Sequence, residues 1–317
     1  MRFAVSTHQT NGLEQIILHD EYAHTEVIIL PEYGAMLHAF IVETRNGFFN
    51  IIDSYADVGS LQKELGLSYK SSKLSPFVCR IPKGKYTYKG QHFELDNKYH
   101  DGSSIHGLLY NKPFRMVDSF CDDTQTSVRL KYIYKKEDRG YPFEYRCEVY
   151  YTLLADNIVQ VKTTILNLDD TEIPLADGWH PYFKLGGKMD RWLLRFNAES
   201  MLEFDQDLVP TGSLLPYTLF KEERPINETT LDNCFMLRKE ETYAACTLFN
   251  PDNGLAISLF PDQSYPYLLI YTPPQRESIA IENLSGAPNC FNNKMGLILL
   301  PPRHTKTFTI QYQISME

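Results

Sequence analysis

The chain has 317 residues, of which 43% are hydrophobic and 22% charged, a composition typical of a folded globular protein. Its 40 acidic residues outnumber its 31 lysines and arginines and give a formal net charge of −9. This balance argues against nucleic acids and anionic membranes as partners. The N-terminal residues lack the features of a signal peptide, and no apolar stretch approaches the ~20 residues that span a bilayer, so we expect a soluble, cytoplasmic protein.

Most of the chain predicts β-strands, because apolar and polar residues alternate with a period of two. In the last predicted strand, Phe308, Ile310, Tyr312 and Ile314 fall on one face, and threonines and glutamines fall on the other. One short helix is expected at residues 58–67. The predicted strands cover residues 26–30, 36–42, 127–134, 144–154, 158–168, 242–249, 255–260, 267–271, 278–282, 296–300 and 306–314.

Turn-forming clusters separate these runs, at a spacing of roughly 8–12 residues that is typical of an all-β sandwich or barrel. No composition break, linker or repeat marks a boundary, so we expect one large antiparallel domain over residues 1–317. Aromatic residues make up 13% of the chain. Such rings suit strands and cores, and an aromatic face also packs on the C–H face of a sugar.

The sequence gives no sign of a metal or nucleotide cofactor. The six cysteines are scattered without a C-x-x-C pair, which indicates free thiols rather than a zinc site or a disulfide framework. No two histidines have the spacing of a zinc-binding helix, and neither a phosphate-binding glycine loop nor a G-x-S-x-G elbow is present. We therefore expect no metal and no cofactor.

His180 is the most informative residue, because the stretch 176–185, ADGWHPYFKL, sets its imidazole among aromatic side chains after a polar turn. An imidazole is the side chain that exchanges protons near neutral pH. Glu282 ends an apolar strand, where a carboxylate must be either paired or functional. Arg80, His106 and Asp232 stand in similar settings, and each also has a structural interpretation, as a turn, cap or solvated residue.

Together these residues resemble the aldose 1-epimerase, or galactose mutarotase, family over almost the whole chain. The similar blocks occur in the family's order: Pro31-Glu32-Tyr33-Gly34-Ala35; Arg80-Ile81 with Lys83-Gly84-Lys85-Tyr86; Ile105-His106-Gly107; Gly140-Tyr141-Pro142-Phe143 with Tyr151-Thr152-Leu153; His180-Pro181-Tyr182-Phe183; Leu231-Asp232; and Glu282. Three positions depart from the family: Cys79 replaces the usual asparagine, Leu108 a common glycine and Asn283 a frequent proline. The first two border the expected sugar site, so they bear on the substrate more than on the chemistry.

The resemblance implies a large antiparallel β-supersandwich with a sugar in an open cleft. It implies a cofactor-independent isomerase that interconverts the α and β anomers of a free aldohexose. In this interpretation Glu282 is the base at the C1 hydroxyl and His180 the acid at the ring oxygen. Arg80, His106 and Asp232 would bind the substrate, and Trp179, Tyr182 or Tyr265 would stack on the ring.

Three alternatives remain open at the level of sequence. The chain could be a non-catalytic carbohydrate-binding protein, a mutarotase for a sugar phosphate or an unusual sugar, or a glycoside hydrolase using two carboxylates. A phosphate site would require a basic cluster, for which Lys83, Lys85 and Lys89 are the candidates near Arg80. The partner expected in the first two cases is a small-molecule sugar, and the chain is expected to be a monomer or a homodimer.

Overall fold

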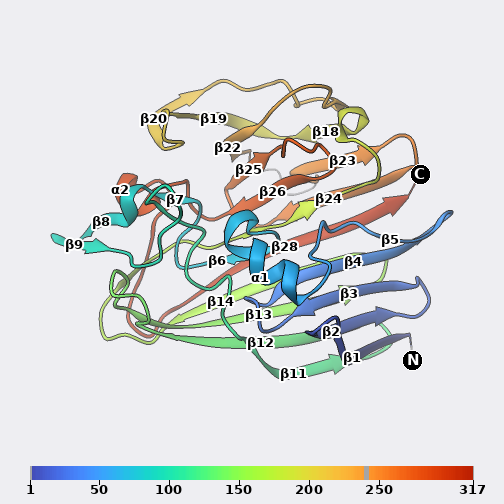
Figure 1. The fold of residues 1–317 in the computed structure, drawn as a ribbon, viewed down its shortest axis with the longest axis horizontal. Coiled ribbons are helices and arrows are strands. Elements are labelled where there is room, and N and C mark those ends of the chain that lie inside the picture. Colours follow the sequence, from blue (N-terminus) through green and yellow to red (C-terminus); the bar gives the residue numbers. More distant parts are fainter. Residues whose placement is uncertain (1, 239–242, 317) are drawn as a thin grey trace.

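A computed structural model of the protein describes residues 2–238 and 243–316. Two large antiparallel sheets dominate it, which confirms the predicted all-β class (Figure 1). The nine-stranded sheet contains, in spatial order, β11 (Arg115–Cys121), β12 (Gln125–Lys135), β13 (Glu144–Leu154), β14 (Ile158–Asn167), β28 (Thr305–Met316), β24 (Leu255–Pro261), β23 (Cys246–Asn250), β18 (Leu193–Phe196) and β21 (Arg224–Pro225).

The eight-stranded sheet carries most of the site described below. Its order is β20 (Pro210–Leu215), β19 (Ala198–Phe204), β22 (Asp232–Leu237), β25 (Tyr267–Tyr271), β26 (Ile279–Leu284), β16 (Gly178–His180) and β6 (Ser72–Leu74), with β17 (Tyr182–Phe183) pairing to β26. The remaining strands form a five-stranded sheet and three short pairs: β1 (Phe3–Thr10), β2 (Leu13–Asp20), β3 (Thr25–Leu30), β4 (Met36–Thr44) and β5 (Gly47–Asn50); β7 (Arg80–Ile81) with β10 (Ser104–Ile105); β8 (Lys85–Tyr88) with β9 (Gln91–Glu94); and β15 (Ile173–Leu175) with β27 (Ile298–Leu300).

The core lies where the nine-stranded sheet packs against the strands of the eight-stranded sheet. The predicted apolar face of β28 is buried, and its Tyr312 hydroxyl donates a 2.9 Å hydrogen bond to Asn283 Oδ1 on β26. Tyr312 also contacts the ring of Phe183, whose centroid lies 5.7 Å away. The alternation read from the sequence therefore faces the inside of the molecule, where burial of apolar area stabilises the fold.

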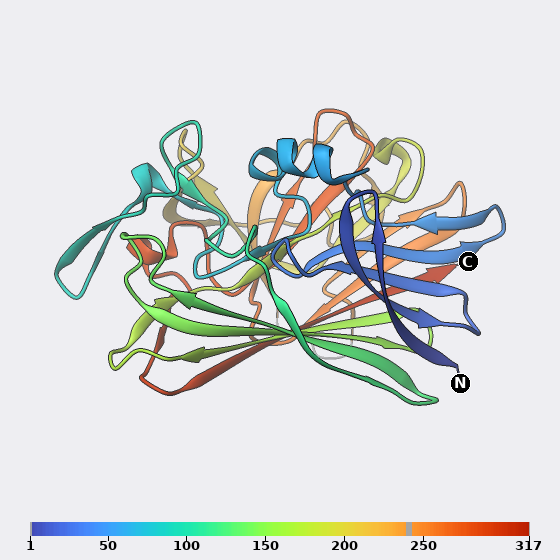
Figure 2. The same cartoon turned by 60° about the horizontal axis from the view of Figure 1, so that its bottom comes forward.

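Helix α1 (Val58–Ser68) confirms the predicted helix and lies on the opposite side of the molecule from strands β11–β14 (Figure 2). Asp57 caps its N-terminus by accepting a hydrogen bond from the Ser60 amide, and Leu61 and Leu65, four residues apart, are buried. Tyr69 follows the helix as its C-cap in a left-handed conformation, and its amide donates a hydrogen bond to the Leu65 carbonyl. The other helical segments are short: α2 (Cys290–Asn293) and the 3₁₀ turns Pro82–Gly84 and Met189–Arg191.

The sequence pattern missed several strands, and the bounds of others differ. Strand β11 is exposed along nearly its whole length, so it carries no inside-outside alternation to detect. The strand expected at 242–249 begins at Cys246, and residue 242 lies outside the described residues. Among the described residues, no helix has both the length and the apolar character needed to cross a bilayer.

Candidate active site

Adjacent strands of the eight-stranded sheet bring together three of the five predicted site residues. His180 ends β16, and Glu282 lies on β26, which pairs directly with β16. Asp232 begins β22, which is separated from β26 by β25 alone. Residues far apart in the sequence therefore share one sheet surface.

Arg80 and His106 approach this surface from the small pair of strands β7 and β10. Arg80 pairs with Ile105, and the His106 amide donates a 2.8 Å hydrogen bond to the Cys79 carbonyl. Cys79 and His106 both have left-handed backbones, with φ of 48° and 57°. Such conformations cost on the order of 1–3 kcal/mol in a residue other than glycine and tend to cluster at functional sites.

Gly107 explains how this loop fits against the sheet. Its φ is +78°, and a Cβ there would lie 2.4 Å from the Ser75 carbonyl oxygen. The glycine is therefore needed both for its left-handed backbone conformation and for the close approach of its segment to the segment around Ser75. It fixes the position from which the preceding His106 enters the site.

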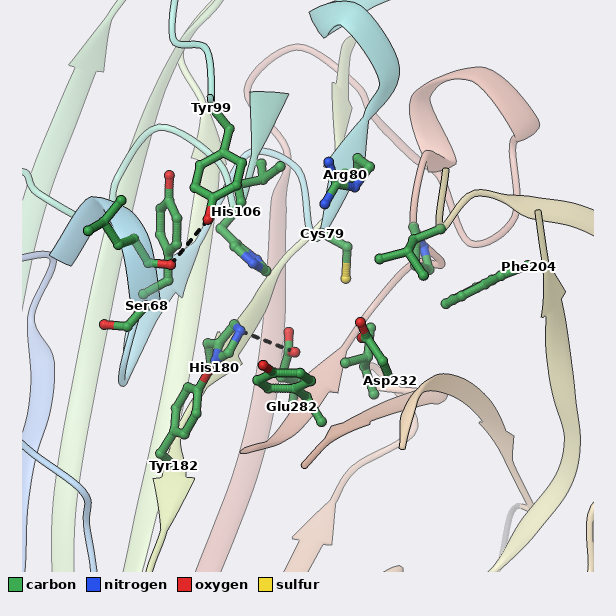
Figure 3. Close-up of a pocket in the computed structure, with 17 residues that line it drawn as sticks. Ser68, Cys79, Arg80, Tyr99, His106, His180, Tyr182, Phe204, Asp232 and Glu282 are labelled. Carbon is green, nitrogen blue, oxygen red and sulfur yellow. Dashed lines mark hydrogen bonds and ion pairs between the residues drawn. The ribbon is translucent and has the colours of Figure 1, made fainter. Parts of the chain in front are cut away.

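All five predicted residues line one pocket of about 270 Å³, and their side chains converge in Figure 3. His180, His106 and Glu282 form the floor, while Arg80 and Asp232 lie to one side of them. The volume suits a small polar molecule rather than a drug-sized one. The structure thus brings all five residues predicted from the sequence together in one pocket.

His180 and Glu282 form the most buried charged pair of the pocket. His180 Nε2 lies 3.3 Å from Glu282 Oε1, and the two side chains are 6% and 1% exposed. Within the described part of the chain, His180 Nδ1 and Glu282 Oε2 have no hydrogen-bond partner. Buried polar atoms are almost always paired, so two unpaired atoms in residues that line one pocket are typical of a functional site rather than of a packed core.

Burial shifts both groups toward their uncharged forms. Desolvation lowers the pKa of His180 to about 4, and desolvation together with the charge of Asp232 holds the pKa of Glu282 well above its usual range. The same desolvation, with the nearby His180, holds the pKa of His106 well below its ordinary value. Burial therefore disfavours both the imidazolium form of His180 and the carboxylate form of Glu282.

Arg80 and Asp232 provide the polar wall of the pocket. Arg80 Nη1 donates to Asp101 and, at 2.7 Å, to Ser103 Oγ, so its guanidinium is held in place. Asp232 is exposed at the pocket edge, and the surrounding protein raises the pKa of its carboxyl while Arg80 opposes that shift. A fixed cation beside a carboxylate offers both donors and acceptors to a neutral polyol.

The floor of the pocket also has the donor set of a metal site. The ligand atoms of His106, His180 and Glu282 all lie within 4.8 Å of one another. Two imidazoles and a carboxylate are ligands that zinc accepts, with the fourth position open. The same three groups also suit proton transfer. Treatment with a chelator distinguishes metal binding from proton transfer.

Several lining residues were missed at the sequence level. They are Leu67, Ser68, Tyr69, Tyr99, Phe204, Leu208, Leu269, Tyr271 and Pro288. Of the three aromatic residues considered for stacking, Tyr182 lines the pocket, whereas Trp179 and Tyr265 are buried in the core. Tyr271 could have been predicted from the sequence, because it ends a predicted strand as Glu282 does. Tyr69 could not, because its place in the pocket depends on where helix α1 ends.

A buried ion pair lies behind the strand that carries His180. Lys73 Nζ donates to Asp177 at 2.6 Å, and both side chains are fully buried. Asp177 also accepts a 2.7 Å hydrogen bond from the Tyr265 hydroxyl, and Lys73 lies 4.5 Å from the ring of Trp179. Tyr265 and Trp179 therefore belong to this network rather than to the pocket.

Comparisons with known proteins agree with this architecture. The family model described as aldose 1-epimerase matches residues 15–313. The uncharacterized protein YihR of Escherichia coli (strain K12) is 28% identical over 243 residues, which are 75% of this chain and 77% of that protein.

Two solved structures show the same fold. A galactose mutarotase-like protein from Clostridium acetobutylicum has a TM-score of 0.87 at 16% identity, covering 100% of this chain and 99% of its own. Galactose 1-epimerase from Lactobacillus acidophilus NCFM has a TM-score of 0.82 at 18% identity, with 100% and 99% covered. The predicted galactose mutarotase-like supersandwich is thereby confirmed.

Proposed function

The chain belongs to the aldose 1-epimerase family, and on that premise we propose that it is a cofactor-independent mutarotase acting on a free aldohexose. The observation that carries the proposal is the buried His180–Glu282 pair, 3.3 Å apart, on the floor of the pocket. Anomer interconversion requires one base and one acid at neighbouring oxygens of the substrate. The pair supplies both groups within the reach of one sugar ring.

The reaction balances without any added reagent. The Glu282 carboxylate takes the proton of the C1 hydroxyl, the C1–O1 bond becomes a carbonyl, and the C1–O5 bond breaks as the His180 imidazolium protonates O5. The C1–C2 bond of the open aldehyde then rotates. Ring closure on the other carbonyl face runs the two proton transfers in reverse, which restores both groups.

This cycle requires that the pair hold one proton. Ring opening starts with the proton on His180 and leaves it on Glu282, and ring closure returns it. The pKa of each group is shifted toward its neutral form, so the state left after ring opening is not penalised by buried charge. Each proton transfer of this type contributes about 10²–10⁴-fold to the rate.

The other pocket residues would bind the sugar and its developing charge. Arg80 and the neutral His106 would donate hydrogen bonds to ring hydroxyls or to the oxygen that becomes negative during proton transfer. Asp232 would accept hydrogen bonds from sugar hydroxyls.

Of the lysines proposed for a phosphate, Lys85 pairs with Glu94 and Lys89 with Glu172, and no lysine of the described chain lines this pocket. The absence of a lysine from the described lining of the pocket supports a free sugar, rather than a sugar phosphate, as the substrate.

The rate should depend on pH as a bell-shaped curve that belongs to the pair. As the pH falls through about 4, His180 takes a second proton onto the pair and no group is left to act as base. As the pH rises through the elevated pKa of Glu282, the pair loses its only proton and O5 has no acid. We expect kcat/KM, measured by polarimetry between pH 3 and 10, to fall at both limits, and a rate that keeps rising with pH would contradict the shared proton.

The proposed function is tested by polarimetry on freshly dissolved α-glucose, α-galactose, xylose, arabinose and glucose 6-phosphate. We expect faster mutarotation of at least one free aldose and no loss of activity after treatment with EDTA. Loss of activity with the chelator would instead assign His106, His180 and Glu282 to a metal. Calorimetric binding of a sugar without faster mutarotation would favour a carbohydrate-binding protein.

A further inference from the structure

The floor of the pocket gathers three metal-binding side chains at one point. The ligand atoms of His106, His180 and Glu282 all lie within 4.8 Å of one another. Figure 3 shows these side chains converging from three segments, namely the loop after β10, the end of β16 and strand β26. Nδ1 of each histidine and Oε2 of Glu282 have no hydrogen-bond partner among the described residues. Buried polar atoms without partners are rare in a packed core, so their concentration here points to a bound ligand.

Two of the three side chains are already placed as a tetrahedral zinc site requires. Zinc bonds to histidine nitrogen and carboxylate oxygen are about 2.0–2.2 Å long, so two ligand atoms at neighbouring corners of the tetrahedron lie about 3.3 Å apart. The observed separation of His180 Nε2 from Glu282 Oε1 is 3.3 Å. The pairing of β16 with β26 keeps these two residues side by side. This part of the site is therefore preformed by the sheet.

His106 supplies the third ligand after a small movement of its ring. The ring lies 4.7 Å from that of His180 and 4.8 Å from that of Tyr69, measured between centroids, and it is nearly perpendicular to the His180 ring. A ligand separation of 4.8 Å, the upper limit in the cluster, has to shrink by about 1.5 Å to fit the tetrahedron. Because His106 lines the pocket, its ring has room to rotate, and the fourth position of the metal faces the same space.

The donor set favours zinc and related ions over magnesium and calcium. Imidazole nitrogen is a good ligand for Zn²⁺, Ni²⁺ and Cu²⁺, whereas Mg²⁺ and Ca²⁺ prefer shells made of oxygen atoms. The charges around the cluster also favour a cation. Asp232 adds a second carboxylate to the pocket, and the charge of Arg80 is offset by its ion pair with Asp101.

A metal ion and the proposed reaction require the same atoms. In the proposed cycle His180 passes a proton to O5 and Glu282 takes one from the C1 hydroxyl. The nitrogen nearest to Glu282 is His180 Nε2, and a metal bond to it uses the lone pair that would hold the proton. Resting on the proposed function, we propose that His106, His180 and Glu282 form an inhibitory Zn²⁺ site, at which the ion excludes the sugar and blocks both proton transfers.

Calorimetric titration with Zn²⁺, after EDTA treatment and dialysis, tests the site itself. We expect one tightly bound ion per chain. Its affinity should fall by more than about 100-fold in His106→Asn, His180→Asn or Glu282→Gln, because loss of an outer-shell partner alone costs about 10–100-fold. Asp232→Asn changes a pocket carboxylate outside the cluster, and His304→Asn changes an exposed histidine, so both controls should bind Zn²⁺ nearly as the wild type does. Wild-type affinity in the cluster variants, or an equal loss in Asp232→Asn, would overturn the site.

Polarimetry with added Zn²⁺ tests the inhibition. We expect Zn²⁺ to raise the KM for the sugar without changing kcat, EDTA to restore the rate, and Mg²⁺ at the same concentration to have no effect. Excess sugar should also weaken Zn²⁺ binding in the calorimeter. A rate that rises with Zn²⁺, or Zn²⁺ binding that the sugar does not weaken, would overturn the inhibition. If no sugar is turned over, the proposed function fails, and the calorimetric comparison of the variants still decides whether these three residues bind the ion.

Discussion

Replacement of His180 by asparagine or of Glu282 by glutamine is expected to lower kcat for mutarotation by about 10²–10⁴-fold, the range for loss of one acid–base group. Each substitution keeps a polar side chain of similar size but removes a group that exchanges protons. The double variant should be little slower than either single variant, because one group without the other cannot complete the cycle. The rates are measured by polarimetry on the sugar with the highest wild-type activity.

Two controls separate this loss from unfolding. Circular dichroism and thermal denaturation should show folded variants, because His180 and Glu282 contact each other and the pocket rather than the main core. His304→Asn and Glu223→Gln make the same chemical changes at exposed positions and should leave the rate unchanged. Full activity in either folded pocket variant would reject the assignment of that residue.

The largest stability effect is expected at the buried Lys73–Asp177 pair. Lys73→Met should lower the free energy of unfolding by about 3–5 kcal/mol, because it leaves the Asp177 carboxylate uncompensated in the core. Burial already raises the pKa of Asp177, and Lys73 opposes that shift. Without the lysine the folded-state pKa rises further, so the added cost is small below the ordinary carboxyl range, grows between the ordinary pKa and the raised one, and levels off above the raised one.

Urea denaturation at pH 5 and pH 8 measures both the loss and its pH dependence. The double variant Lys73→Met/Asp177→Leu should recover part of the stability, because both buried charges are then absent. Lys135→Met, at an exposed position on β12, provides the control. A loss at Lys73 within about 0.5 kcal/mol, the range of ordinary surface substitutions, would show that the pair contributes little.

Local patterns in the sequence were sufficient to predict the strands that are buried on one face. The bounds predicted for β13 and β25 agree with the structure, and the inward face of β28 was read correctly from its alternation. Strands without such a contrast were missed, β11 above all. Apolar and polar residues alternate only where one face of a strand is buried, so a strand exposed on both faces shows no such alternation in the sequence.

The sequence by itself determined the fold class, the family resemblance and the five polar residues that now line one pocket, because each of these depends on residue type and order along the chain. Only the tertiary structure decided which strands are neighbours, and therefore that His180 lies 3.3 Å from Glu282 although the two residues are far apart in the sequence. It also decided that Trp179 faces the core while Tyr182 faces the cleft. Strand order and register arise from long-range pairing and packing, and no local pattern encodes them.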